Sequence, residues 1–108
     1  MNPLLQAAAD DPATAPLLPP KFSPGQIVAT PGALAALEAH DCSPWSLLAR
    51  HLSGDWGSLP AEDARSNDDA LTSEGRLLSS YPIGPDTRIW IITEWDRSVS
   101  TLLLPSEY

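Results

Sequence analysis

One stretch constrains the fold of this chain more than any other, the run Arg-Ile-Trp-Ile-Ile-Thr-Glu-Trp at residues 88–95. It is rich in β-branched and aromatic residues, which favour strands. Its apolar residues are nearly continuous, which predicts a central strand covered on both faces or nearly so. Turn-forming residues lie before it at 84–87 and after it at 96–98. With strands predicted over residues 77–81 and 99–104, these turns predict an antiparallel three-stranded meander.

Helix-start signals precede this sheet. Thr30-Pro31 and Ser43-Pro44 each place an N-cap residue before a proline at the first helical position. They predict one helix over about residues 31–39 and a second helix that ends before Gly54. A third helix is predicted over residues 60–74, with Ser58 as its N-cap.

The order of these elements predicts an α+β fold, β-α-α-α-β-β-β, in which three short helices pack on one face of a small antiparallel meander in two layers. A short strand at residues 26–30 would join the sheet at an edge. Residues 1–21 hold five prolines and five alanines, which predicts a flexible Pro/Ala-rich tail. A single folded domain is therefore expected over residues 22–108.

The charge of the chain bears on its partners. Its 108 residues carry a net charge of −8, so its surface repels phosphates and direct nucleic-acid binding is not expected. A protein partner with a basic surface fits this charge better. The single cysteine, Cys42, excludes an internal disulfide framework and a cysteine-based zinc site. No apolar run approaches the ~20 residues of a membrane span, and no signal peptide is evident, so a cytoplasmic protein is expected.

Several segments together carry a resemblance to a known family. They are residues 24–34, Arg50 to Gly57, Asp63, Asn67, Ala70-Leu71, Arg76, residues 89–98 and residues 103–108. In these segments the chain resembles small bacterial proteins of plasmids and other mobile elements, called "plasmid-related protein" or "type I restriction endonuclease subunit M". The resemblance covers about residues 22–108 and implies a genomic setting rather than a reaction. A methyltransferase would need a cofactor-binding domain larger than this chain, with a Gly-rich strand-turn-helix motif. The sequence contains no such motif, so no cofactor is expected.

The segment Arg50 to Gly57 is the densest run of chemically capable residues. His51 and Asp55 lie four positions apart, and a histidine beside a carboxylate can act as a general base. With Asp63 they would make a mixed nitrogen and oxygen metal site, although no metal motif is complete. The alternative is structural, with His51 bonded at a helix end and Asp55 capping the turn at Trp56-Gly57.

A second group of candidates follows the predicted sheet. Arg76, Glu94 and Arg97 lie near one sheet edge, where two arginines and a glutamate can hold a phosphate or a carboxylate. Asn67 is a polar residue on an apolar helix face, and Thr101 could add a hydroxyl group. The alternative is a cross-strand salt bridge between Glu94 and either arginine.

The third predicted helix is strongly acidic. Within residues 60–74 the acidic residues are offset by Arg65 alone, and they are Glu62, Asp63, Asp68, Asp69 and Glu74. Trp90 and Trp95 are five positions apart and so point to opposite faces of the strand, which leaves at least one of them partly exposed. An exposed tryptophan beside an acidic helix is typical of a protein-binding hot spot. Trp56, just before this helix, is a core residue if its indole is buried and a contact residue if it is exposed.

Three hypotheses follow from the sequence. The first is a small acidic interaction protein of a mobile genetic element, an anti-defence or regulatory factor that binds a basic protein surface. The second is a small nuclease or hydrolase with His51 as the central catalytic residue. The third is a small-ligand-binding domain with the polar cluster as its pocket.

Overall fold

The computed structural model describes residues 2–3 and 20–108. Most of the predicted tail, residue 1 and residues 4–19, lies outside the described residues. Two residues of that tail, Asn2–Pro3, form β1. The radius of gyration of the chain is 12.9 Å.

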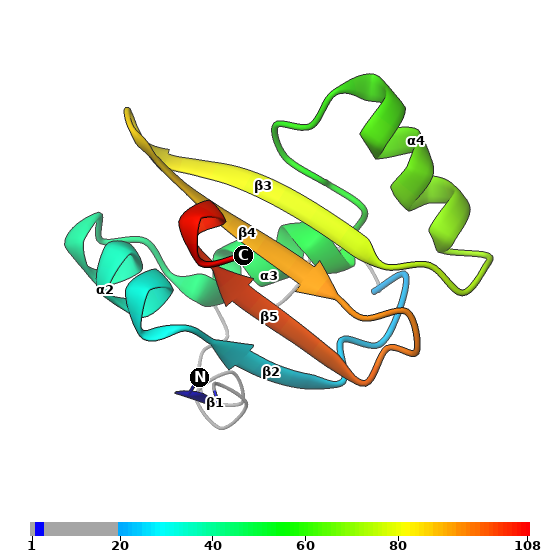
Figure 1. Cartoon of the computed structure of the whole chain (residues 1–108), viewed down its shortest axis with the longest axis horizontal. Coiled ribbons are helices and arrows are strands. Elements are labelled where there is room, and N and C mark those ends of the chain that lie inside the picture. The colour runs from blue at the N-terminus through cyan, green and yellow to red at the C-terminus, as the bar shows by residue number, and fades with distance from the viewer. Residues whose placement is uncertain (1, 4–19) are drawn as a thin grey trace.

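The sheet has the strand order β1-β2-β5-β4-β3 (Figure 1). Strands β3 (Leu77–Gly84), β4 (Thr87–Thr93) and β5 (Val99–Leu103) pair antiparallel, which confirms the predicted meander. β2 (Gln26–Ala29) lies parallel to β5, with Ile27 opposite Ser100, and β1 pairs antiparallel with β2. The α+β class and the predicted element order are confirmed.

Three helices connect β2 to β3. The first, α2 (Pro31–Ala39), and the second, α3 (Pro44–Leu52), begin at the predicted prolines, with side-chain caps from Thr30 and Ser43. The third, α4 (Ala61–Ala70), has Pro60 as its N-cap rather than Ser58, because the Ser58 amide pairs with the Ser80 carbonyl.

α4 also ends four residues earlier than predicted. The guanidinium of Arg97 donates to the Ala70 carbonyl at 2.6 Å, so a residue 27 positions away takes one of the carbonyl groups that a helix end leaves unpaired. Residues 71–74 then form a turn instead of another helical turn. This difference arises from a tertiary contact that local sequence signals do not contain.

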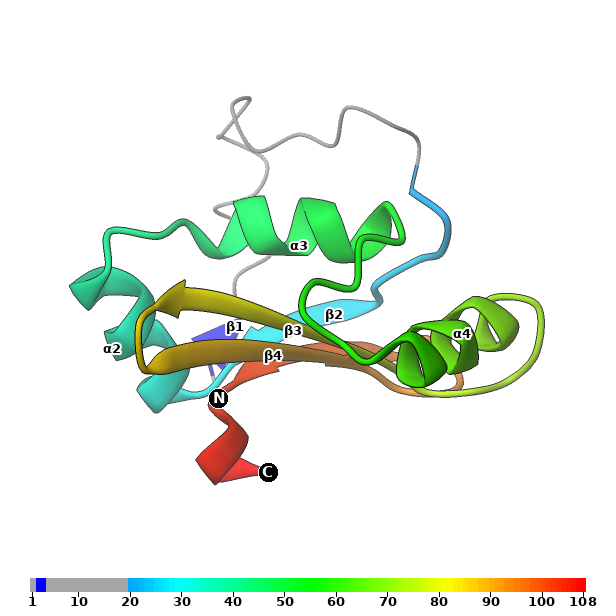
Figure 2. The same cartoon turned by 90° about the horizontal axis from the view of Figure 1, so that it is seen from above.

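The helices are not all stacked on one sheet face. In Figure 2, α3 lies across one face, while α2 lies at one end of the sheet and α4 lies beside the edge formed by β3. Of the described segments, the short C-terminal turn η2 (Pro105–Glu107) is the one that lies on the opposite face in the same view. Among the described residues, no helix is both long and apolar enough to span a membrane.

The two faces of β4 explain its continuous apolar sequence. Ile89 and Ile91 are fully buried in the main core with the apolar side chains of α3, and Thr93 on the same face is buried as well. On the other face Ile92 is also buried, whereas Trp90 keeps partial exposure beside Tyr108, with ring centres 5.8 Å apart. Both faces of this central strand are therefore largely shielded, as the sequence predicted.

Candidate functional site

His51 lies at the centre of a buried polar chain. Its position in the last turn of α3 directs its ring onto the sheet, and the residue has no exposed surface. Its Nδ1 lies 2.5 Å from the Ser79 hydroxyl of β3, and its Nε2 lies 2.9 Å from the Thr93 hydroxyl of β4. The chain continues from Thr93 to the Ser100 hydroxyl of β5 at 2.6 Å.

The last hydrogen bond of this buried polar chain fixes the direction of all the others. Ser100 donates its hydroxyl proton to the Pro24 carbonyl at 2.8 Å, so its oxygen must accept from Thr93. Thr93 has only one hydroxyl proton, so its oxygen accepts from Nε2 of His51. Nδ1 then accepts from Ser79. The geometry therefore selects the neutral His51 tautomer that is protonated at Nε2.

Burial keeps this histidine neutral. Desolvation, with a smaller contribution from the charge of Arg97, lowers the pKa of His51 to about 3. Phe22 and Trp56 pack edge-on against the imidazole, with ring centres 5.2 and 5.6 Å away. A histidine with both nitrogens bonded and no solvent contact acts here as a strut between α3 and three strands.

Asp55 is directed away from His51. Its carboxylate pairs with Arg50 at 2.7 Å and accepts from the Gly57 amide at 3.1 Å. The hydrogen bond from Arg50 is the main cause of the lowered pKa of Asp55 and of the raised pKa of Arg50. Both side chains are about half exposed, so this pair adds little to stability. Asp55 thus caps the turn after α3, which agrees with the structural role given above as the alternative to catalysis.

Arg76, Glu94 and Arg97 lie close together, with the Arg97 guanidinium 3.2 Å from the Glu94 carbonyl, but their side chains bond to different groups. Arg76 and Glu94 form an exposed pair at 3.5 Å, and Arg76 also donates to the Tyr108 hydroxyl at 3.0 Å. The Arg97 guanidinium instead donates to the carbonyls of Gly75 and Ala70, both at 2.6 Å. The five predicted catalytic residues therefore occupy an interior strut, a turn, a surface pair and a helix end, not one cleft.

Asn67 closes the outer edge of the sheet. Its side-chain amide donates to the Leu78 carbonyl at 2.7 Å and its oxygen accepts from the Leu78 amide at 3.1 Å, as a neighbouring strand would. The backbone groups of Ser80 on the same edge bond to Trp56 and Ser58. This explains why a helix face of otherwise small apolar residues carries a buried asparagine.

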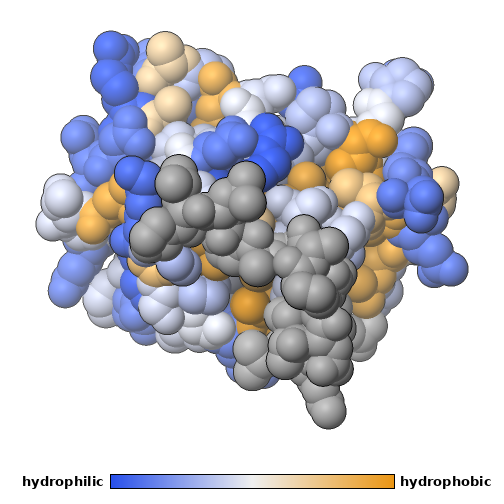
Figure 3. Space-filling view, turned by 180° about the vertical axis from the view of Figure 1, so that it is seen from behind, coloured by the Kyte–Doolittle hydropathy of each residue, from blue (hydrophilic) through white to orange (hydrophobic). Residues whose placement is uncertain are grey.

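The remaining predicted binding residues differ in exposure. Trp56 is buried in a second core cluster, and its Nε1 donates to Asp68 at 3.0 Å. Thr101 is partly exposed on the sheet face opposite α3. The acidic residues predicted for the third helix are all exposed, namely Glu62, Asp63, Asp68, Asp69 and Glu74, although Glu74 lies in the turn after α4. In Figure 3, hydrophilic side chains gather along the upper left, the edge that α4 forms in this view from behind.

A shallow hollow at the end of α4 was not predicted from the sequence. It measures about 420 Å³ and is lined by the turn at residues 71–74 and by Trp95, Asp96 and Arg97. Trp95 is 54% exposed, one of only two large hydrophobic residues with such exposure in the described part of the chain. The available signal was its place in a turn, one residue beyond Glu94, where alternation no longer directs a side chain into the core.

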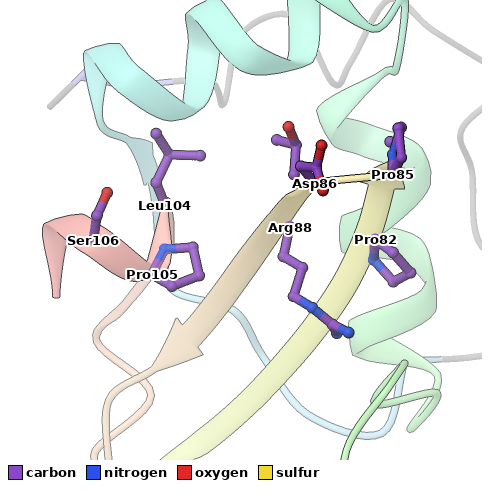
Figure 4. Close-up of a pocket in the computed structure, with 9 residues that line it drawn as sticks. Pro82, Pro85, Asp86, Arg88, Leu104, Pro105 and Ser106 are labelled. Carbon is purple, nitrogen blue, oxygen red and sulfur yellow. The ribbon is translucent and has the colours of Figure 1, made fainter.

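A second hollow of about 470 Å³ lies between the β3–β4 hairpin and the C-terminal turn. Figure 4 shows the Arg88 side chain extending from β4 towards β3, where its guanidinium donates to the Ser80 hydroxyl at 3.3 Å. The predicted polar cluster of Asn67, Arg76, Glu94 and Arg97 does not line it. No group of three or more His, Cys, Asp and Glu residues suited to a metal ion occurs within the described ranges.

Comparison with known proteins adds no family to this geometry. No protein-family model, curated protein or solved structure matches the chain.

Proposed function

We propose that this chain is a small acidic interaction protein of a mobile genetic element, an anti-defence or regulatory factor that binds the basic surface of a protein partner through α4. The observation that carries the proposal is the exposed acidic surface of this helix and the turn after it. We call it the α4 acidic surface, and it consists of Glu62, Asp63, Asp68, Asp69 and Glu74.

The charges of the α4 acidic surface are available to a partner. Among the residues that the structure describes, none of its carboxylates lies within 4.0 Å of a basic side-chain nitrogen, whereas Asp55 and Glu94 are both paired. Unpaired like charges on one surface raise the rate of encounter with an oppositely charged protein and select against acidic ones. This supports binding to a basic surface rather than a role in folding.

The helix that carries these charges is held rigidly. Asn67 bonds it to β3, Asp68 accepts from the buried Trp56, and Arg97 binds its last carbonyl. A surface fixed before binding loses little conformational freedom when a partner docks, which favours affinity. Three independent contacts for one ten-residue helix fit a surface that must keep its shape.

The test removes charge from α4 and compares the result with a matched control. Glu62→Gln/Asp63→Asn/Asp69→Asn removes three charges from the α4 acidic surface. Glu38→Gln/Asp41→Asn/Asp86→Asn removes three from exposed positions in and after α2 and in the β3–β4 hairpin. These lie at the opposite end of the molecule from α4 (Figure 1). Both variants would be used with the full chain to recover partners from host cells.

We expect the wild-type chain and the control variant to recover a basic protein that the α4 variant does not recover. The amount recovered should fall as the salt concentration rises. Equal recovery by both variants, or recovery of no specific protein by wild type, would contradict the proposal. A partner lost equally from both variants would show that total charge, not α4, determines binding.

A further inference from the structure

The hollow at the end of α4 combines an exposed indole with two carboxylates. Trp95 and Asp96 come from the β4–β5 turn, and Glu74 comes from the turn after α4. Trp95 is 54% exposed, and Glu74 and Asp96 are exposed as well. An aromatic face attracts a cation within about 6 Å of its centre, and nearby carboxylates strengthen that attraction. We call these three residues the Trp95 site.

The negative charge at this hollow is firmly held. The Ser98 hydroxyl and amide both donate to Asp96, at 2.6 and 3.1 Å, and these bonds lower the pKa of Asp96 below its usual value. Asp96 is therefore ionised throughout the physiological range. The same two bonds hold the turn that presents the indole, so the Trp95 site does not have to be ordered when a ligand arrives.

Arg97 carries the only positive charge in the lining of this hollow, and its guanidinium is directed into the protein. It donates to the carbonyls of Ala70 and Gly75 and lies 5.7 Å from the centre of the Phe22 ring. These contacts partly offset the charge of Arg97. Besides the hydroxyl groups of Thr72 and Ser73, the exposed groups that remain in the lining are an indole and two carboxylates.

We propose that the Trp95 site binds one arginine or lysine side chain of the partner, with the cation over the indole and in ionic contact with Glu74 and Asp96. This inference rests on the proposed function and names the residue type that the partner supplies. Arginine suits the site better, because its planar guanidinium stacks on an aromatic ring and pairs bidentately with a carboxylate. The partner residue would sit beside the α4 acidic surface, at its C-terminal end.

The test uses two peptides that differ in charge alone. Acetyl-Gly-Arg-Gly-amide and its citrulline analogue, a neutral isostere, would each be titrated into the ¹⁵N-labelled full chain while the indole N–H signals are followed by NMR. The Trp95→Phe variant assigns the signal of Trp95. We expect the arginine peptide to shift this signal saturably and the citrulline peptide to leave it unchanged. In Glu74→Gln/Asp96→Asn, which keeps the indole, binding should weaken about threefold or more.

Three results would overturn the inference. The first is no shift at Trp95, the second is equal shifts by both peptides, which would make Trp95 a purely apolar contact, and the third is shifts confined to the other three indoles.

Failure of this inference is distinguishable from failure of the proposed function. If the peptide does not bind but the α4 variant still loses its partner selectively, the acidic surface acts without the Trp95 site. If the peptide binds but both charge variants recover partners equally, the site stands and the α4 proposal does not.

Discussion

The buried chain at His51 and the α4 acidic surface both contain titratable side chains, but in opposite surroundings. Both nitrogens of His51 are bonded to hydroxyl groups, and no buried polar side-chain atom in the described part of the chain lacks a partner. The carboxylates of α4 are exposed and, within that same part, none forms an ion pair.

This contrast teaches where to look for function in a small protein. A satisfied interior chain has no free donor or acceptor for a substrate, so it contributes specificity of packing. An exposed run of like charges contributes nothing comparable to packing, which is why we propose that it binds a partner. A reactive interior would contradict this contrast, whereas a chain that folds normally without the α4 charges would support it.

The largest effect is expected from Trp56→Ala. Trp56 is 6% exposed and packs against His51, so its removal should destabilise the fold by about 3–5 kcal/mol. Denaturant unfolding monitored by circular dichroism measures this change. Trp95→Ala is the matched control, since an exposed residue should alter stability by only about 0.5 kcal/mol or less. Equal effects of the two variants would mean that the interior and the surface are not distinct.

The next effect concerns pH. The folded pKa of His51 is about 3, below the value of 6.5 in the unfolded chain, so the unfolded state takes up the proton first as pH falls. Stability from this group is complete above the unfolded pKa and declines towards the folded pKa, by about 2–3 kcal/mol between roughly pH 7 and pH 4.5.

The His51→Gln variant, which cannot titrate in this range, should lack that part of the pH dependence, as urea unfolding at several pH values would show. His40→Gln makes the same substitution at an exposed position and is the matched control. A His51→Gln profile parallel to wild type would contradict the buried, neutral histidine.

A smaller effect is expected from Asn67→Ala. This change leaves the amide and carbonyl of Leu78 without their side-chain partner at the sheet edge, which should cost about 1–3 kcal/mol. Hydrogen exchange of the Leu78 amide should accelerate by more than the loss of global stability alone would cause. If the Leu78 amide exchanges no faster than the global change requires, Asn67 does not close the edge.

The smallest effect on stability is expected from Glu62→Gln/Asp63→Asn/Asp69→Asn. Loss of favourable charges in the first turn of α4 is offset by relief of repulsion, so the net change should be about 1 kcal/mol or less. Thermal unfolding at low and high salt would measure it. A large destabilisation would show that these charges serve the fold, which would weaken the proposed function.

Local signals predicted much of this fold. The Thr30-Pro31 and Ser43-Pro44 starts of α2 and α3 depend on residues within one helical turn, and both were correct. The early end of α4 was missed because Arg97 lies 27 residues beyond the carbonyl that it binds. The parallel pairing of β2 with β5 was missed for the same reason, since two segments more than 70 residues apart determine it.

The candidate residues were recognised by type but not by arrangement. His51 was identified, whereas Thr93 and Ser100, which bond in series with it, were not, because each lies on a different strand and only the folded sheet brings them together. The signal available was a hydroxyl residue at an inward position of each strand, which an apolar core alone does not explain.

The most direct measurement is the titration of His51 by NMR, through its imidazole ¹⁵N and Cε1–H signals. We expect a neutral ring with the proton on Nε2 and no titration until about pH 4 or below, because burial holds the pKa of His51 at about 3. A midpoint near the ordinary value of 6.5 would contradict this account. The imidazole would then be open to solvent, and the hydrolase hypothesis with His51 at its centre would regain its physical basis.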